Sequence, residues 1–504
     1  MSAAARWTRL VLLTALLVLP MTFSLSMGKG LTHDEHQHVA AGALLARESL
    51  LPYRDFPYFH TPHLVFVYGW LFRSGGCFLL KARAFSAVCA ALTAGVLFAA
   101  AWHALRRWNP RARWIGSLSA LALLLCNPLF GKASGQAWNH DPSTLCALAG
   151  VVLLLAASGT RRQMPALLAS GVLLGLAVGF RITWAPIALP MLGVIAYARS
   201  RVVNSLAVFS LGALLGLAPL LWLFVIAPAQ TVFNNFEFPK VNVLYRLATG
   251  EERTMTVLKK ALFFLQEIIR PELALVAVLA LCALLWWRAK NRAGDPLWLI
   301  GLVAMIPFVL IGSFAPSPLF SQYFYAPVPF LILAGVFALA AAYREAPPLR
   351  PATSALLAGV VIASAVGARN FSSASDLFFP SAWVPIQGHA DAQSMRAAAP
   401  PGRVLTLAPL RAIEAGLPIY PAFSTGPFAW RVARFVTPDR RSRLGLVSED
   451  ELEGYLRGDP PAAILLGYDK KGEKPLAAYA AAHGYLRQPL SRDETALWLR
   501  PPLP

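Results

Sequence analysis

Eleven apolar runs dominate the first 368 residues of this 504-residue chain and leave few options for its fold. The runs lie at residues 10–27, 84–105, 114–130, 144–157, 166–180, 182–198, 206–226, 273–287, 297–314, 323–342 and 355–368. A helix needs about 17–25 mostly apolar residues to cross a hydrocarbon core. Because 57% of the residues are hydrophobic and only 14% are charged, the chain does not resemble a soluble protein. The sequence predicts an α-helical polytopic membrane protein with about eleven transmembrane helices.

Basic residues predict how these helices are oriented, because they gather in every second loop. Loops rich in Lys and Arg stay in the cytoplasm, so we expect the N-terminus inside and the polar loops near residues 34 and 141 outside. The predicted location is the inner (plasma) membrane of a bacterium, multi-pass, with the active face toward the periplasm, since no eukaryotic retention signal is visible. The basic residues are Arg106, Arg107, Arg111, Arg113, Arg161, Arg162, Arg199, Arg201, Arg288, Lys290, Arg292, Arg344 and Arg350.

Several other classes of protein are disfavoured by the same sequence. The net charge of +20 does not indicate a nucleic-acid partner, since much of it serves topology and no aromatic-basic module is visible. The run 10–27 is expected to remain as a span, because no small-residue cleavage site of a signal peptide follows it. Of the five cysteines only Cys77 lies in an outer loop, so no disulfide framework or cysteine metal motif is predicted.

The composition changes after residue 368 and predicts a second domain. Residues 369–504 are less hydrophobic and richer in Pro, Gly and charge. Within them, 403–410, 461–469 and 494–500 are typical of short strands, and 475–485 is typical of a helix. We therefore predict a transmembrane domain at 1–368, with its first outer loop at 28–83, and a small C-terminal α/β domain at 369–504 on the outer face.

The first outer loop contains the candidate catalytic carboxylates. Thr32 and Glu35 match the capping-box pattern S/T-x-x-E, which predicts a helix over 33–50 along the membrane surface. Asp34 and Glu35 follow the first span directly, and ionisable groups at a membrane are functional candidates by default. The alternative is that the two carboxylates only favour the positive end of a helix dipole. A second outer segment, 229–271, ends in an amphipathic stretch at 257–270.

A third candidate catalytic carboxylate, Asp141, lies at the outer start of the fourth predicted span. Its depth in the membrane should match that of Asp34, so the two groups could share a cavity. His140 precedes it and is a candidate for the substrate pocket. Pro142 would also suit the first turn of an ordinary helix, which leaves a purely structural role for Asp141 open.

Four basic residues lie at span ends on the predicted outer side, where positive charge does not help orientation: Lys81 and Arg83 before the second span, and Arg181 and Arg270. Arg181 follows the fifth span, and Arg270 precedes the eighth. Arginine binds phosphate bidentately, so both residues are candidates for binding an anionic ligand such as a phosphate. The alternative is that they reach up to lipid headgroups.

The histidines of the first outer loop allow two interpretations. Histidine and carboxylate side chains bind Zn²⁺ or Mn²⁺, which makes Asp34 and His38 possible ligands, but the spacing matches no strict zinc signature. The metal site is therefore left unknown, and the sequence requires no cofactor. His60 and His63 lie three residues apart and are predicted to form part of the wall of a substrate pocket.

These motifs together resemble the GT-C glycosyltransferases, most nearly the protein O-mannosyltransferases and the bacterial lipid A aminoarabinose transferases. The resemblance covers about residues 5–345 and is strongest at 32–63, where Asp-Glu opens the surface helix and P-Y-R-D-F and H-x-P follow. NHDP, with Asp141, is similar to a second acidic position. GFRITWAPIALP is similar to the segment G-x-x-x-x-x-K-x-P, with Arg181 where Lys is usual. SQYFYAPVPFLILAG resembles R-Y-x-x-P-x-x-P, with Gln322 in place of Arg.

The resemblance implies a membrane glycosyltransferase that works on the outer face. Its donor would be a polyprenyl-phosphate-linked sugar, and the hexosyl or pentosyl group would pass with inversion to a glycan, lipid or protein acceptor. Asp34 would be the catalytic base, and Tyr323 would join Arg181 and Arg270 at the donor phosphate. A divalent metal stays open as a cofactor.

Two other functions remain as alternatives. One is a transporter or flippase of lipid-linked sugars, which would be expected to have charged or broken spans at the midplane and repeated halves. The other is a membrane anchor that presents the C-terminal domain.

Overall fold

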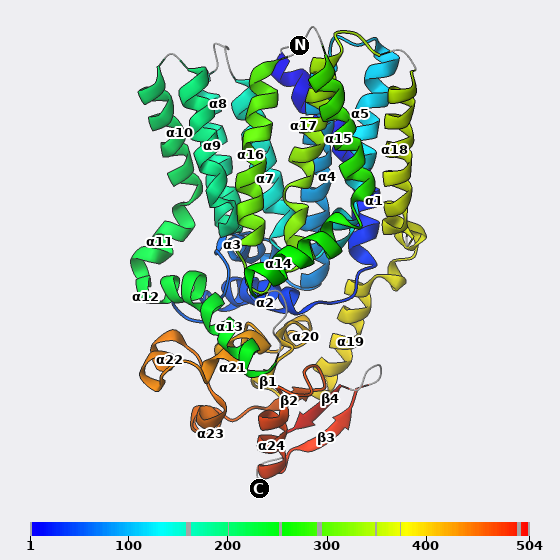
Figure 1. Ribbon diagram of the computed structural model, residues 1–504. Coiled ribbons are helices and arrows are strands. Elements are labelled where there is room, and N and C mark those ends of the chain that lie inside the picture. Colours follow the sequence, from blue (N-terminus) through cyan, green and yellow to red (C-terminus); the bar gives the residue numbers. More distant parts are fainter. Residues whose placement is uncertain are drawn as a thin grey trace.

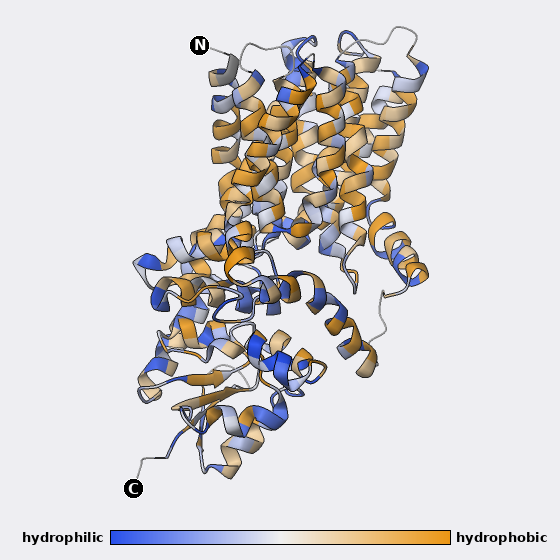
Figure 2. Ribbon diagram, turned by 90° about the vertical axis from the view of Figure 1, so that its left-hand side faces the viewer, coloured by the Kyte–Doolittle hydropathy of each residue, from blue (hydrophilic) through white to orange (hydrophobic). Residues whose placement is uncertain are grey.

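The protein is a bundle of long helices joined at one end to a smaller domain of helices and strands (Figure 1). The computed structural model describes residues 3–157, 163–199, 201–250, 255–289, 295–347, 350–372, 374–490 and 495–501. Apolar residues cover the bundle, whereas polar and apolar residues mix at the other end (Figure 2). This distribution suits a bundle embedded in lipid whose opposite part faces water.

Long helices form the bundle, and their apolar runs are those expected from the sequence. Within the described residues, six helices are long and apolar enough to cross a membrane, or up to eight if each of two bent pairs is one span. The bundle helices are α1 (Ala3–Met27), α4 (Phe78–Ala104), α5 (Pro110–Leu125), α7 (His140–Ala156), α8 (Gln163–Phe180), α9 (Ala188–Ala198), α10 (Val202–Gly216), α15 (Leu273–Arg288), α16 (Pro296–Phe314), α17 (Val328–Ala342) and α18 (Pro351–Gly367). The polytopic helical fold is thus confirmed, and the count of eleven spans stays a prediction.

The basic loops used to predict orientation are only partly described. Arg161, Arg162, Lys290 and Arg292 lie outside the described residues. The N-terminus lies at the end of the bundle opposite the C-terminal sheet (Figure 1), as the predicted topology requires. Which end faces the cytoplasm stays a prediction.

Three of the predicted apolar runs are interrupted. The run 114–130 ends as a helix at Leu125, because the Asn127 side chain accepts hydrogen bonds from the Leu129 and Phe130 N–H groups and begins a new short helix. The run 182–198 starts as a 3₁₀-helix. The run 206–226 bends by 62°, beside Pro219, since proline lacks the N–H group that would continue the helix.

Shorter helices lie across the end of the bundle that faces the smaller domain. They are η1 (Phe72–Ser74), α2 (His33–Glu48), α3 (His63–Leu71), α6 (Pro128–Ala133), η2 (Ile182–Ile187), α11 (Ala218–Ile226), α12 (Pro228–Val232), η3 (Phe233–Glu237), α13 (Phe238–Ala248), α14 (Val257–Phe263), η4 (Phe264–Ile269) and η5 (Ser321–Tyr325). The helix predicted over 33–50 is confirmed as α2, with both halves of the Thr32–Glu35 capping box present, and its position along the membrane surface stays a prediction. The segment Val257–Ile269 meets α15 at 87°, which fits the predicted amphipathic stretch.

The C-terminal part contains the small sheet expected from the sequence. Its order is β1-β2-β4-β3, with β1 parallel to β2 and the other pairs antiparallel. Its elements are η6 (Ala368–Phe371), η7 (Ala374–Phe378), η8 (Pro380–Ala382), α19 (Val384–Ala398), β1 (Val404–Thr406), α20 (Pro409–Glu414), η9 (Pro421–Phe423), α21 (Pro427–Ala433), α22 (Pro438–Leu444), η10 (Glu449–Glu451), α23 (Leu452–Leu456), β2 (Ala463–Leu466), α24 (Lys474–Ala482), β3 (Leu486–Pro489) and β4 (Ala496–Leu499). Strand β3 was not predicted, because all of its residues are exposed and an edge strand carries little apolar signal.

The C-terminal part packs directly on the polar end of the bundle. Buried residues of both parts belong to one continuous hydrophobic cluster. The Leu79 N–H donates to Glu414 Oε1 at 2.6 Å, and Arg47 Nη1 donates to the Ile413 carbonyl at 3.2 Å. Helix α20 therefore holds the C-terminal part against α2 and the start of α4.

Candidate active site

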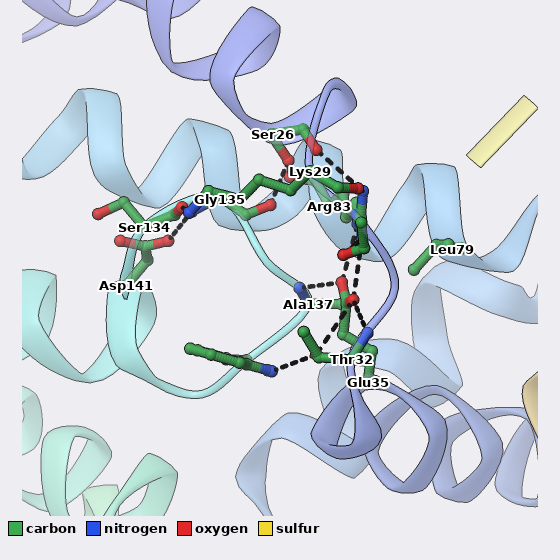
Figure 3. A network of polar contacts seen from close by, with 12 residues as sticks. Ser26, Lys29, Thr32, Glu35, Leu79, Arg83, Ser134, Gly135, Ala137 and Asp141 are labelled. Carbon is green, nitrogen blue, oxygen red and sulfur yellow. Dashed lines mark hydrogen bonds and ion pairs between the residues drawn. The ribbon is translucent and has the colours of Figure 1, made fainter. Parts of the chain in front are cut away.

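A fully buried ion pair organises the polar end of the bundle (Figure 3). Arg83 Nε and Nη2 donate to the two carboxylate oxygens of Glu35 at 2.8 and 2.9 Å, and both side chains are 0% exposed. The Glu35 carboxylate also accepts from the Ala137 N–H at 2.9 Å and the Thr32 N–H at 3.1 Å. Glu35 therefore holds together three chain segments, which are those of Thr32, Arg83 and Ala137.

The arginine of this pair also fixes the loop between α1 and α2. Arg83 donates to the carbonyls of Ser26 at 3.1 Å, Lys29 at 2.6 Å and Gly30 at 3.0 Å. Arginine is suited to this role because its planar fork offers five donors. From the sequence, Arg83 is only a cation on the predicted outer side of the membrane. The structure gives it Glu35 as its partner.

Asp141 takes part in a second buried network on the same loop. Asp141 is 1% exposed, and its Oδ2 accepts from the Gly135 N–H at 2.8 Å. Lys29 lies near enough for the two charges to act on each other, and its Nζ donates to the carbonyls of Lys132 and Ser134. Burial lowers the pKa of Lys29 to about 8, while Asp141 acts in the opposite direction. Asp141 therefore holds the 134–141 loop in shape, and Glu35 and Lys29 join that loop to the 26–35 loop (Figure 3).

Asp34, the neighbour of Glu35, is only partly buried and faces different groups. Burial raises the pKa of its carboxyl to about 6, and a hydrogen bond from Gln37 and the positive charge of Arg181 oppose that shift. The Gln37 Nε2 amide donates to Asp34 Oδ1 at 3.3 Å. A carboxylate with this pKa is ionised near neutral pH and can still accept a proton, as general base catalysis requires.

Arg181 occupies a break between α8 and η2, where its backbone is extended. Its Nη1 lies against the His140 imidazole, 2.7 Å from Nδ1 and 2.8 Å from Nε2. Its Nε donates to Thr183 Oγ1 at 2.9 Å, and its guanidinium carbon lies 4.7 Å from the centre of the Tyr323 ring. Three segments that are distant in the sequence, α7, η2 and η5, thus hold a cation whose charge acts on Asp34.

Histidines and a tyrosine line the other side of Asp34. Gln37 Nε2 also donates to His60 Nε2 at 3.2 Å, and the His60 and His38 rings lie 4.7 Å apart. His38 Nδ1 and the Tyr58 hydroxyl share a hydrogen bond of 2.7 Å. Burial lowers the pKa of His60 to about 3, and Arg181 acts in the same direction. These imidazoles are therefore neutral, and the positive charge that acts on Asp34 comes from Arg181 and, to a smaller extent, from Arg431.

Not all the predicted site residues join this cluster. His63 Nε2 and the Gly216 carbonyl share a hydrogen bond of 2.8 Å, so His63 connects α3 to α10. Arg270 is exposed at the end of η4, and no hydrogen bond or ion pair joins it to Arg181 within the described residues. Among the same residues, no three His, Cys, Asp or Glu side chains come together as metal ligands.

Sequence reasoning missed several residues that complete the site. Lys29, Gln37 and Tyr58 were not singled out, because a lysine, an amide or a tyrosine in a loop has many ordinary roles. Their proximity to Asp34 and Asp141 arises only when the loops fold together. The one signal available was their place within residues 28–63, the stretch already richest in polar groups.

Comparison with known proteins identifies the fold. No protein-family model and no curated protein matches the chain. Its structure is similar to that of ArnT from Cupriavidus metallidurans bound to undecaprenyl phosphate, with a TM-score of 0.61 at 15% identity over 99% of this chain and 100% of that chain. The apo state of the same protein matches with a TM-score of 0.57 at 16% identity, covering 100% of both chains. The chain has the GT-C fold.

An archaeal enzyme supports the same assignment. The apo oligosaccharyltransferase from Archaeoglobus fulgidus matches with a TM-score of 0.52 at 13% identity, over 94% of this chain and 70% of that chain. ArnT, a lipid A aminoarabinose transferase, and the oligosaccharyltransferase both belong to the GT-C superfamily. The resemblance inferred from the sequence is therefore confirmed, and at these identities the likeness establishes the fold alone.

Proposed function

We propose that this protein is a membrane glycosyltransferase that uses a polyprenyl-phosphate-linked sugar as its donor. The observation that carries the proposal is the partly exposed Asp34 carboxylate, held by Gln37 and with a pKa of about 6, near enough to Arg181 for the two charges to act on each other. The structure of ArnT with undecaprenyl phosphate shows that a protein of the same fold binds such a carrier. The acceptor would be a glycan, a lipid or a protein, and the active face would be the periplasmic one.

The donor phosphate fits best against Arg181. Within the described residues, no hydrogen bond occupies its Nη2, whereas Nη1 and Nε are held by His140 and Thr183. A guanidinium fixed at two nitrogens is a preorganised donor for a phosphate oxygen. The Tyr323 ring supports the guanidinium plane from one side. Arg270 is not needed for this arrangement.

The proposed transfer step moves one proton and one sugar. An acceptor hydroxyl oxygen attacks the anomeric carbon of the donor from the face opposite the phosphate, while Asp34 takes the hydroxyl proton. The bond between the anomeric carbon and the phosphate oxygen breaks, and the polyprenyl phosphate leaves with the electron pair, which gives inversion. A positioned base typically raises the reaction rate about 10²–10⁴-fold. A hydrogen-bond donor aimed at the charge that develops on the leaving phosphate raises the rate about 10²–10³-fold.

Glu35 and Asp141 take positioning roles in this proposal. The Glu35 carboxylate is enclosed by Arg83, Ala137 and Thr32, so an acceptor cannot reach it without breaking the buried pair. Asp141 is buried against the Gly135 N–H. Both residues hold the loops that place Asp34 and His140, and neither is assigned a proton-transfer role.

The transporter alternative is less well supported. That reading expects broken helices at the midplane of the membrane. Two bent helix pairs are present, α10 with α11 and Val257–Ile269 with α15. Both bends lie at the end of the bundle that carries α2 (Figure 1), where they widen the polar end and do not interrupt the middle of the bundle.

Asp34→Asn tests the proposed function directly. The purified protein in proteoliposomes is given lipid-linked sugars extracted from bacterial membranes, and release of undecaprenyl phosphate is measured. We expect the variant to lose at least 100-fold in rate because the base is gone, with unchanged thermal stability. The matched control is Asp450→Asn, since Asp450 is an exposed carboxylate of the C-terminal part. Full activity of Asp34→Asn would overturn the role given to Asp34, and an inactive wild-type protein would overturn the function.

A further inference from the structure

A tyrosine of the C-terminal part reaches the candidate active site. Tyr468 follows β2 in a loop whose shape is fixed by Glu473, which accepts from the Gly467 N–H at 2.7 Å and the Tyr468 N–H at 3.2 Å. Gly467 has a φ of +111°, a conformation that favours glycine. The Trp430 indole donates to the Gly472 carbonyl at 2.8 Å and closes the other end of the loop. The loop is therefore preorganised to present Tyr468.

The contacts of Tyr468 are with the first turn of α2. Its hydroxyl shares a hydrogen bond of 2.6 Å with His33 Nδ1, and its ring packs edge-on against the His36 ring at 4.5 Å. Burial raises the pKa of the Tyr468 hydroxyl, and the negative charge of Asp34 raises it further. Tyr468 thus lies close to His33 and Asp34, although more than 400 residues separate it from them in the sequence.

These three residues are more exposed to water than their neighbours on α2. His33 is exposed, and Asp34 and Tyr468 are partly exposed, whereas Glu35 and His36 on the next positions of α2 are buried. Water therefore reaches Tyr468, His33 and Asp34, whereas Arg181 is held by His140 and Tyr323, which belong to segments of the bundle. A lipid-linked donor held by Arg181 leaves the Tyr468 side for the other substrate.

We propose that Tyr468, paired with His33, positions the acceptor hydroxyl at Asp34, so that the C-terminal part completes the acceptor site. This inference rests on the proposed glycosyltransferase function. A tyrosine hydroxyl can both donate and accept, and it can guide an acceptor hydroxyl while its partner His33 fixes its orientation. Tyr468 is a positioning residue in this scheme, and the proton still passes to Asp34.

Tyr468→Phe tests the inference, because it keeps the ring packing and removes only the hydroxyl. The full-length protein is assayed in proteoliposomes with two probes, undecaprenyl-phosphate-linked sugars as donor and a lipid extract of bacterial envelopes as acceptor. We expect the half-saturating amount of acceptor extract to rise at least fivefold, while the half-saturating donor concentration and the binding of undecaprenyl phosphate stay unchanged. Tyr485→Phe is the matched control, since the Tyr485 hydroxyl donates to the Pro461 carbonyl at 2.6 Å within the same part of the fold and does not reach α2.

The outcomes separate this inference from the proposed function. If the wild-type protein transfers sugar and Tyr468→Phe keeps the wild-type acceptor dependence, the inference is wrong and the function stands. If the wild-type protein releases no undecaprenyl phosphate from any lipid-linked sugar, the function itself fails. Should Tyr468→Phe prove unstable, His33→Ala removes the same hydrogen bond from an exposed position, and an unchanged acceptor dependence in that variant would equally contradict the inference.

Discussion

At the scale of single residues, two adjacent carboxylates have opposite environments. Glu35 is enclosed and paired with Arg83, whereas Asp34 is partly exposed and lies near Arg181. The difference follows from helix geometry, because neighbouring positions on a helix point about 100° apart. One side chain turns into the protein and stabilises it, and the other remains available to substrate.

The raised pKa of Asp34 predicts the pH dependence of transfer. A base must be ionised, so activity is present above the pKa of about 6 and is lost as the pH falls through it. We expect kcat/KM of the wild-type protein to fall about fivefold between pH 6 and pH 5, because the ionised fraction of the base falls by that factor. Arg181→Gln should move this acid limb to higher pH, because it removes a cation that favours the carboxylate. A wild-type activity profile whose acid limb has its midpoint near pH 4 would contradict the role of Asp34.

The buried pair of Glu35 and Arg83 predicts a large effect on stability. Glu35→Gln leaves the Arg83 charge buried without a counterion, which typically costs about 3–5 kcal/mol. We expect a clearly lower Tm in detergent. The control is Glu237→Gln, because Glu237 pairs with Arg440 at 2.7 Å with side chains 36% and 48% exposed, and such pairs contribute about 0–1 kcal/mol. Equal losses in the two variants would show that the burial of the Glu35 pair does not matter.

At the scale of elements, the site depends on the close packing of α2 on α3. Gly42 lies in the buried face of α2, where an added Cβ would come within 2.4 Å of Tyr68 Cβ. Tyr68 is itself fully buried and stacks on Phe72. The two helices can lie this close only because position 42 has no side chain, and α2 carries Asp34, Gln37 and His38 to the site.

Gly42→Ala should therefore disturb the site from a distance. Overpacking of this kind typically costs about 1–3 kcal/mol, and α2 must shift away from α3. We expect a lower Tm and reduced transfer activity. Gly193→Ala in α9 is the matched control, since no heavy atom lies within 4 Å of its added Cβ, and it should leave both properties unchanged. A wild-type Tm in Gly42→Ala would mean that α3 adjusts without strain.

At the scale of the whole molecule, every group of the proposed site lies at one end of the bundle. Helix α2 and the C-terminal sheet share that end, and the N-terminus lies at the other (Figure 1). A substrate carried by a membrane lipid can then approach from the bundle side, and a polar substrate can approach from the side of the C-terminal part.

Accessibility labelling tests this arrangement in the membrane. Single cysteines are introduced by Asp450→Cys and Arg107→Cys in a chain lacking Cys77 and Cys126, the two native cysteines that are not buried. With intact spheroplasts and a membrane-impermeant maleimide, we expect labelling at 450 and none at 107 until the cells are lysed. Labelling in the reverse order would place the proposed active site in the cytoplasm and overturn the use of a periplasmic acceptor.

The sequence by itself determined the class of fold, the surface helix, most of the small sheet and the importance of residues 32–63. Apolar runs, a capping box and strand composition are local signals, and each can be read without knowing what packs against it. The choice of Asp34, Arg181, His140 and Tyr323 as neighbours also began with local motifs. Their common position at one end of the bundle followed from the expected crossing of the membrane.

Only the tertiary structure decided which carboxylate is exposed and which is structural. Glu35 and Arg83 are 48 positions apart, Asp34 and Tyr468 are much farther apart in the chain, and no local pattern marks either relation. The breaks at Asn127 and Pro219 differ from these relations, because a capping side chain and a missing N–H group are local causes that the sequence already contains. Burial and charge pairing arise only when the chain folds, because the free energy of a charged group depends on the groups that surround it.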